Sequence, residues 1–256
     1  MDPLAFITAL ARDAGALLRD RLNDPRRIEQ KQPQDLVTDA DRASEALIVE
    51  RIRDAFPRAA ILGEEGGAYR GDGDERFIVD PLDGTTNYAH RYPLFCVSIA
   101  YERAGVLEAG AIYAPLLDEL YAARKGGGAT RNGEPICVST IGAVANAMVC
   151  TGFNPARYAR NGRHFGALSN LAQAVRRDGS AALDLAFVAT GIYDAFWEFD
   201  LKPWDIAAGW VLIEEAGGRV GAIAGGPLDL DEGSILASNG AIHDEIQSAL
   251  ARADAG

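Results

Sequence analysis

The chain has 256 residues, which suits one large domain or two closely joined halves. Hydrophobic residues make up 48% and charged residues 24%, as in ordinary soluble globular proteins. The net charge of −12, from 25 Lys and Arg against 37 Asp and Glu, disfavours nucleic acid as a partner, because binding to its phosphates requires a basic face. The same charge would repel an anionic substrate unless a metal ion lay between them.

The cysteines give no sign of a disulfide framework or a zinc site. Cys96, Cys137 and Cys150 are odd in number, form no Cys-x-x-Cys pair and lie in apolar stretches, so we predict that they are core residues. The N-terminus lacks the basic and apolar regions of a secretion signal, and no apolar run is long enough to span a bilayer. We therefore expect a cytoplasmic protein without a membrane partner.

The N-terminal part of the chain predicts a helix followed by short strands. Apolar residues at helical spacing place the helix at 4–22, and strands are expected at 28–31 and 60–62. Residues 63–74 are expected to form a turn and a loop, and the turn carries Glu64. Because acidic residues in loops are usually only solvated, Glu64 by itself is weak evidence of a site.

A second helix is expected between the strands at 28–31 and 60–62. Thr38 is placed to cap its N-terminus, Asp41 follows at the capping-box position, and the helix ends before Pro57. By itself, Asp41 is best explained as a helix-start carboxylate and Lys31 as an exposed lysine.

Residues 77–88 are the most informative stretch. The apolar run at 77–79 predicts a buried strand, which we expect to end at Asp80-Pro81, because proline has no N–H for a strand ladder. Asp83-Gly84 is a turn signal, and two threonine hydroxyls follow. Two carboxylates three residues apart at the exit of a buried strand supply the hard oxygen ligands that Mg²⁺ prefers.

The middle of the chain predicts an antiparallel meander. Its strands are expected at 95–101, 106–113 and 119–123. The glycine run at 126–128 does not fit a dinucleotide-binding fingerprint, since it neither matches G-x-G-x-x-G nor opens a helix.

We place a boundary between two halves near residues 138–146, giving an N-terminal α+β half, 1–140, and a C-terminal α/β half, 141–256. In the second half, Ser180 is expected to cap a helix whose first N–H groups could hold an anion. A strand ends at Glu198, and Asp205 lies in the first turn of a later helix. The expected strands are 147–151, 175–177, 192–198, 219–223 and 234–237, and the expected helices are 156–172, 180–189, 203–216 and one from 241 onward.

Several common catalytic chemistries lack their sequence motifs. The chain has no G-x-S-x-G, no H-E-x-x-H and no G-x-x-x-x-G-K-[ST], and its three histidines are too few and too scattered for a multi-histidine site. What remains is a set of carboxylates at the ends of expected elements: Asp41, Glu64, Asp80, Asp83 and Asp205.

These carboxylates lie in motifs that resemble those of the inositol monophosphatase family. Asp-Pro-Leu-Asp-Gly-Thr-Thr-Asn at 80–87 is similar to the family's first signature, and Trp-Asp-Ile-Ala-Ala-Gly at 204–209 to its second. Gly-Glu-Glu at 63–65 and Lys31 with Asp-Leu-Val-Thr-Asp-Ala-Asp at 35–41 also match, in the family's order. The resemblance covers nearly the whole chain.

The resemblance implies a fold and a residue-by-residue site. The expected fold is α/β (α+β), a layered α/β/α/β/α sandwich of the sugar phosphatase type, in a homodimer that binds two or three Mg²⁺ and is inhibited by Li⁺. The first half would hold most metal ligands, and the second Asp205 and the substrate contacts. Implied catalytic residues are Glu64, Thr85, Asp41 and Lys31; implied metal ligands are Glu64, Asp80, the Leu82 carbonyl, Asp83 and Asp205; implied phosphate and substrate contacts are Asp83, Gly84, Thr85, Ala181, Glu198 and Asp205.

The function that the resemblance implies is Mg²⁺-dependent hydrolysis of myo-inositol monophosphate by metal-activated water. The same chemistry on fructose 1,6-bisphosphate, histidinol phosphate or a 3′-phosphoadenosine nucleotide remains an alternative. A regulatory or binding protein on the same fold is an alternative of another class. The missing glycine fingerprint disfavours a dinucleotide-dependent oxidoreductase.

Overall fold

A computed structural model of the chain describes residues 1–22, 28–32, 35–153 and 158–255, with the backbone alone described for 28–32 and 35–37. Among these residues the strands form one sheet of eight, one of five and a separate antiparallel pair, β1 (Ile28–Gln32) and β2 (Asp35–Thr38). No helix in the described ranges has the length and apolar character needed to cross a membrane.

The eight-stranded sheet is a meander extended at both ends. Its pairs are antiparallel except for β3 with β5. In spatial order it contains β10 (Glu134–Ile136), β9 (Gly128–Arg131), β8 (Glu119–Arg124), β7 (Val106–Ala114), β6 (Cys96–Arg103), β5 (Glu75–Asp83), β3 (Ala60–Gly63) and β4 (Gly67–Tyr69). The predicted three-strand meander is confirmed. β4 is a strand where we expected a turn and a loop, and β9 and β10 are strands that we did not predict.

The five-stranded sheet belongs wholly to the C-terminal part of the chain. Its central strand, β13, pairs in parallel with β11 and antiparallel with β15. The spatial order is β12 (Ala174–Arg176), β11 (Met148–Thr151), β13 (Ala195–Glu198), β15 (Ile235–Ser238) and β14 (Arg219–Ala222). The first sheet ends at Ile136 and the second begins at Met148, while the proposed division into two halves near residue 140 stays a prediction.

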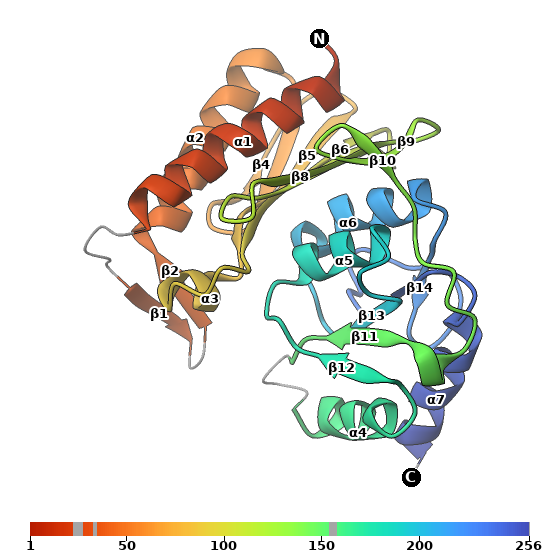
Figure 1. Ribbon diagram of the computed structural model, residues 1–256. Helices are drawn as coiled ribbons and strands as arrows, with labels where there is room; N and C mark the ends of the chain where they lie inside the picture. The colour runs from red at the N-terminus through yellow and green to blue at the C-terminus, as the bar shows by residue number, and fades with distance from the viewer. Residues whose placement is uncertain (23–27, 33–34, 154–157, 256) are drawn as a thin grey trace.

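Helices and sheets alternate in five layers (Figure 1). The outer helices on one side are α1 (Pro3–Arg21) and α2 (Asp39–Ala55), and those on the other are α4 (Tyr158–Ser169) and α7 (His243–Ala255). Between the two sheets lie α5 (Ala181–Ala189) and α6 (Pro203–Glu215). The short elements α3 (Thr85–Ala89) and a 3₁₀ turn (Val144–Asn146) complete the fold. The predicted α/β/α/β/α sandwich is confirmed.

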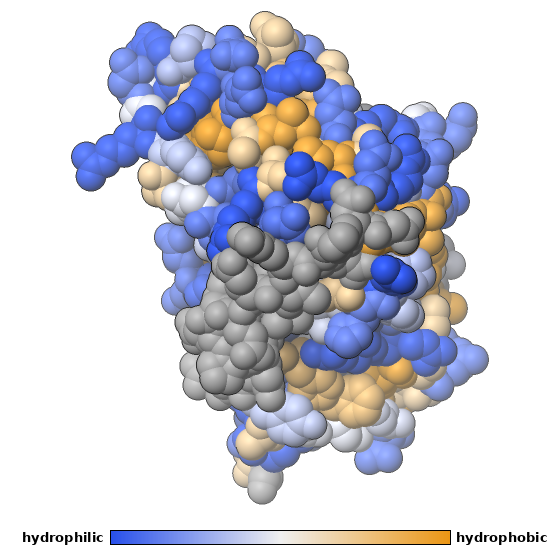
Figure 2. Space-filling model, turned by 90° about the vertical axis from the view of Figure 1, so that its left-hand side faces the viewer, coloured by the Kyte–Doolittle hydropathy of each residue, from blue (hydrophilic) through white to orange (hydrophobic). Residues whose placement is uncertain are grey.

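The distribution of apolar residues explains this layering. All nine residues of α5 are buried, as expected for a helix that is apolar apart from Asp184 and lies between two sheets. By contrast, α1 buries one stripe that includes Ile7, Leu10, Ala14 and Leu18, and its opposite side is exposed. On the face shown in Figure 2, hydrophilic side chains predominate over much of the described surface, with hydrophobic areas in its upper and lower parts.

The predicted end of β5 at Asp80-Pro81 is wrong. The strand continues to Asp83, and its register with β6 shifts between the pairs Asp80 with Ser98 and Asp83 with Cys96. Three residue steps on β5 therefore face two on β6, which is a β-bulge. The bulge accommodates Pro81, whose missing N–H would otherwise interrupt the ladder.

Close packing of α6 on the large sheet depends on Gly110 of β7. A methyl group added there would lie 2.6 Å from the Ala208 carbonyl oxygen of α6. We expect Gly110→Ala to lower the free energy of unfolding by about 1–3 kcal/mol, the usual cost of overpacking. Gly162→Ala is the matched control, because Gly162 is exposed on α4 with open space around it, and it should stabilise by about 0.4–1 kcal/mol. Urea unfolding measures both, and an unchanged Gly110→Ala would contradict this account of the packing.

Candidate active site

Three carboxylates meet where β5 leaves the large sheet and α6 begins. One oxygen each from Asp80, Asp83 and Asp205 lies within 4.8 Å of the other two. Asp80 accepts the Leu82 N–H at 2.9 Å, and Asp205 accepts the Lys202 N–H at 2.7 Å, so each side chain is held by its local backbone. The β5 bulge and the first turn of α6 thus position the acidic cluster. Its first and last members, Asp80 and Asp205, are 125 residues apart in sequence.

The electrostatics of this cluster favour a cation. Burial and then the carboxylates of Glu64, Asp83 and Asp205 raise the pKa of Asp80 well above its ordinary value. Burial and then the Asp83 carboxylate raise the pKa of Asp205 in the same way. A divalent cation between the carboxylates would offset both effects, and hard oxygen ligands of this kind suit such an ion. The residues present therefore fit a metal site.

Glu64 reaches the cluster from a turn that α2 holds in place. Its charge contributes to the raised pKa of both Asp80 and Asp205. The neighbouring backbone is fixed by Glu45 of α2, which accepts the N–H of Glu65 at 2.8 Å and of Gly66 at 2.5 Å. Sequence reasoning missed Glu45; its signal was a carboxylate one turn after Asp41, next to the apolar positions of the helix.

Asp41 makes two sets of contacts, one within the first turn of α2 and one with Thr85. Its Oδ2 accepts the Thr38 N–H at 2.9 Å and the Thr38 hydroxyl at 2.5 Å, which forms the predicted capping box of α2. Its Oδ1 accepts the Thr85 hydroxyl at 3.0 Å. The Thr85 hydroxyl also lies 3.1 Å from the Leu82 carbonyl, a second acceptor for its single hydrogen.

The start of α5 binds a carboxylate of the protein itself. Asp83 Oδ2 accepts the Ser180 hydroxyl at 2.6 Å and the Ala182 N–H at 2.8 Å. Ser180 occupies the predicted N-cap position, but its side chain accepts no capping bond; its hydroxyl donates to Asp83. The Cys96 thiol lies 3.8 Å from the same oxygen.

A pocket of about 180 Å³ opens beside the acidic cluster. Its walls include Asp83, Ala181, Glu198 and Asp205, with Phe153 at one side. Burial, then the carboxylates of Asp205 and Asp83, raise the pKa of Glu198 to about 8. A larger pocket, of about 830 Å³, lies elsewhere, around Trp210 and Leu228, and it is lined by none of the predicted site residues whose side chains the structure describes.

Comparison of the sequence with known proteins identifies the family of the chain. The sequence model of the inositol monophosphatase family matches residues 2–255. The inositol-1-monophosphatase of Synechocystis sp. is 44% identical over 254 residues, covering 97% of this chain and 88% of that protein. The chain belongs to the inositol monophosphatase family. Members of this family are metal-dependent phosphatases, and this chain is therefore an enzyme, a phosphatase.

Two further relatives cover essentially the whole chain. The Nus factor SuhB of Escherichia coli strain K12 is 41% identical over 267 residues, covering 98% of this chain and all of that protein. The crystal structure of SaIMPase-II with bound inositol monophosphate, an enzyme of Staphylococcus aureus, superposes with a TM-score of 0.84 at 31% identity. That alignment covers 98% of this chain and 95% of the other.

The structure brings together most of the residues that the sequence singled out for this phosphatase. The charges of Glu64 and Asp83 both contribute to the raised pKa values of Asp80 and Asp205, and Thr85 contacts Asp41. Gly84, at φ 92°, starts α3 in the left-handed conformation that favours glycine. Ala181 and Glu198 line the adjoining pocket. The side chain of Lys31 lies outside the described residues, and the assigned roles of all these residues stay predictions.

Glu198 should make the metal-free phosphatase lose stability as pH rises. Its folded pKa of about 8 exceeds the ordinary value of 4.5, so the folded state holds an extra proton between these values. Stability must therefore fall as pH rises through this window, by up to about 1.4 kcal/mol per pH unit. In EDTA, Glu198→Gln should reduce this loss of stability with rising pH. The variant should be more stable than wild type at pH 8, and it should show no such gain below about pH 4.5.

The check is urea unfolding in EDTA at a series of pH values. Glu214→Gln, which changes an exposed carboxylate on the neighbouring α6, is the control and should leave the wild-type pH profile unchanged. A Glu198→Gln profile parallel to that of wild type would show that Glu198 ionises normally in the fold.

Proposed function

We propose that this phosphatase is a Mg²⁺-dependent phosphomonoesterase that hydrolyses myo-inositol monophosphate to inositol and phosphate. The observation that carries the proposal is the buried cluster of Asp80, Asp83 and Asp205 beside a pocket. Its excess negative charge suits metal ions, and the chain's net charge of −12 makes such ions necessary for binding an anion. The name of the Synechocystis relative and the inositol monophosphate in one structure of SaIMPase-II support inositol monophosphate as the substrate, whereas a second structure of SaIMPase-II has 2'AMP bound.

Glu64, Asp80, Asp83, Asp205 and the Leu82 carbonyl would hold two or three Mg²⁺ ions. When bound, Mg²⁺ lowers the pKa of a bound water and offsets negative charge on the phosphoryl oxygens. All five groups offer oxygen, and four of them are carboxylates, as this hard ion requires. Lys31 would lie outside these ligands and adjust the charge of the site.

The Thr85–Asp41 pair would orient the attacking water. The Thr85 hydroxyl has one hydrogen, and when it donates that hydrogen to Asp41 Oδ1, 3.0 Å away, its oxygen is left as an acceptor. An attacking water that donates to Thr85, with Glu64 as a second partner, would present a lone pair to phosphorus. Threonine is too weak a base to act alone, so Asp41 is an essential part of this proposal.

The substrate would lie between the start of α3 and the pocket. Backbone N–H groups of Gly84 and Thr85 would bind the phosphate, since the left-handed Gly84 begins a helical turn there. Ala181 and the Glu198 carboxylate line the pocket and would contact the inositol ring and accept its hydroxyl groups. Asp83 and Asp205 would reach the substrate through the ions that they hold. Another phosphomonoester could make the same contacts, so the assay on a panel of phosphate esters distinguishes inositol phosphate from the alternatives.

Two wider features of the family form part of the proposal: inhibition by Li⁺ and assembly of a cytoplasmic homodimer. A second candidate function also has a specific observation behind it, because the Escherichia coli relative is named a Nus factor. A regulatory role of that class would use the folded surface and would survive loss of the metal ligands, whereas the phosphatase activity would not.

Asp83→Asn tests the site and the reaction together. It keeps the shape of the side chain but removes a charge from the proposed ligand set, so we expect kcat for inositol 1-phosphate to fall by about 10²–10³-fold. Phosphate release is measured with Mg²⁺ titrated from zero, with and without Li⁺, and on a panel of other phosphate esters. Asp20→Asn, an exposed change in α1, is the control.

Metal-dependent, Li⁺-sensitive turnover that is lost only in Asp83→Asn would support the proposal. Activity confined to another phosphomonoester would keep the chemistry and replace the substrate. Unchanged turnover in Asp83→Asn would exclude the proposed site, and a binding partner retained by that variant would favour the regulatory candidate.

Thr85→Val tests the proposed orientation of water. Valine keeps the branched shape without the hydroxyl, so kcat should fall by about 10²-fold while the dependence on Mg²⁺ concentration changes little. Thr85→Ser retains the hydroxyl and should keep most activity. Steady-state kinetics on the three proteins checks this, and a Thr85→Val enzyme as fast as Thr85→Ser would remove Thr85 from the reaction.

A further inference from the structure

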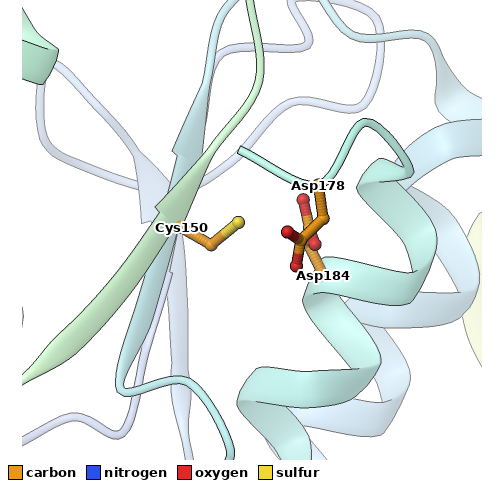
Figure 3. Close-up of side chains that lie close together, drawn as sticks. All are labelled: Cys150, Asp178 and Asp184. Carbon is orange, nitrogen blue, oxygen red and sulfur yellow. The ribbon is translucent and has the colours of Figure 1, made fainter. Parts of the chain in front are cut away.

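A second cluster of ionisable side chains lies around the first turn of α5, near the first cluster. Cys150 comes from β11, Asp178 from the segment between β12 and α5, and Asp184 from the first turn of α5. Figure 3 shows the Cys150 thiol pointing toward the two carboxylates, which face each other. One ligand atom from each residue lies within 4.8 Å of the other two. None of these residues belongs to the proposed Mg²⁺ ligand set.

The carboxylate of Asp184 is only partly satisfied by the protein, through a hydrogen bond with the Cys150 thiol. The residue is 1% exposed, and its Oδ1 oxygen is buried with no hydrogen-bond partner among the residues that the structure describes. Buried carboxylate oxygens are almost always paired, because an unpaired one loses its hydration without compensation. The unpaired oxygen belongs to the carboxylate that points into the cluster, and it therefore indicates a missing ligand there.

The charge around the cluster indicates that this ligand is a cation. Burial and then the Asp178 carboxylate raise the pKa of Asp184, and Asp83 and Glu198 act in the same direction. Burial and then the carboxylates of Asp184 and Asp178 also raise the pKa of the Cys150 thiol. A positive ion at the centre would favour the ionised form of all three ligands.

We propose that Cys150, Asp178 and Asp184 form a second metal site, for a thiophilic divalent ion such as Zn²⁺. A thiolate with two carboxylates is a ligand set that Zn²⁺ accepts and Mg²⁺ does not favour. The Tyr193 hydroxyl donates to Asp178, which is the kind of outer hydrogen bond that orients a ligating carboxylate. Asp184 also lines the pocket beside Glu198, so water from the pocket can supply the fourth ligand.

Binding at this site releases protons, which makes its pH dependence predictable. The Cys150 S–H bond breaks, the sulfur lone pair forms the bond to the ion, and the proton passes to solvent. Affinity should therefore increase with pH. The ion is not consumed, and no oxidant or reductant is involved.

Cd²⁺ is the probe, because its bond to a thiolate gives an ultraviolet charge-transfer absorption that carboxylate ligands do not produce. The starting protein is the double variant Cys96→Ser with Cys137→Ser, in which Cys150 is the only thiol. Excess Mg²⁺ is present to compete at the carboxylate cluster. We expect the absorption to saturate at one Cd²⁺ per chain and to be reversed by Zn²⁺.

Two further substitutions in the double variant decide the assignment. Cys150→Ser should abolish the absorption, and Asp184→Asn should weaken Cd²⁺ binding by about 10-fold or more, whereas exposed Asp20→Asn should leave it unchanged. Absence of thiolate absorption in the double variant, or full affinity in Asp184→Asn, would overturn the proposal. If Cys150→Ser does not fold, the double variant and Asp184→Asn still decide it.

Discussion

The hydrogen bonds between Asp83 and the start of α5 are the interaction on which the rest of the site depends. Asp83 ends β5 in the large sheet, and its partners Ser180 and Ala182 start a helix packed against the small sheet. Asn87, four residues on, adds a second link by donating to the Leu94 and Asp178 carbonyls. One short stretch of sequence thus orients β5, α3 and α5 together, and residues nearly 100 positions apart meet in one pocket.

This arrangement places acidic groups where proteins normally avoid them. Asp80 is buried beside carboxylates that oppose its ionisation. The neighbouring residues of β5 and β6 are mostly buried and apolar. The surrounding packing fixes the backbone, so the carboxylates are unable to separate, and a bound cation is the effective way to reduce their repulsion. Burying these carboxylates destabilises the fold, and the buried apolar contacts of α5 and α6 between the sheets offset this destabilisation.

The positions of the helices and long strands could be predicted from the sequence better than the pairing of the strands. Strong periodicity and caps located α1, α2 and the meander, because these signals are local. The end of β5 was misplaced, because proline usually ends a strand, and only the pairing of β5 with β6 reveals that a bulge accommodates it. The strands β4, β9 and β10 have three or four residues each, too few for a periodic pattern, and they exist because neighbouring strands pair with them.

The candidate site shows the same division between local and tertiary information. The carboxylates were identifiable from their motifs, and their proximity follows from the fold alone. Glu45 was missed because its role, accepting two N–H groups of the turn after β3, is a contact across 20 residues. The cluster of Cys150, Asp178 and Asp184 was also missed, since each residue is unremarkable in sequence and only the meeting of β11 with α5 brings them together.

Charge links substrate binding to ion binding under the proposed function. The acidic cluster and the net charge of −12 both oppose a phosphate monoester, so the substrate's affinity must rise as ions occupy the site. Coupling of this kind is reciprocal, and the substrate must raise the affinity for the ions by the same factor. An ion held by few protein ligands gains most from the phosphate oxygens. Of the proposed ions, the one with the fewest protein ligands should therefore depend most on the substrate.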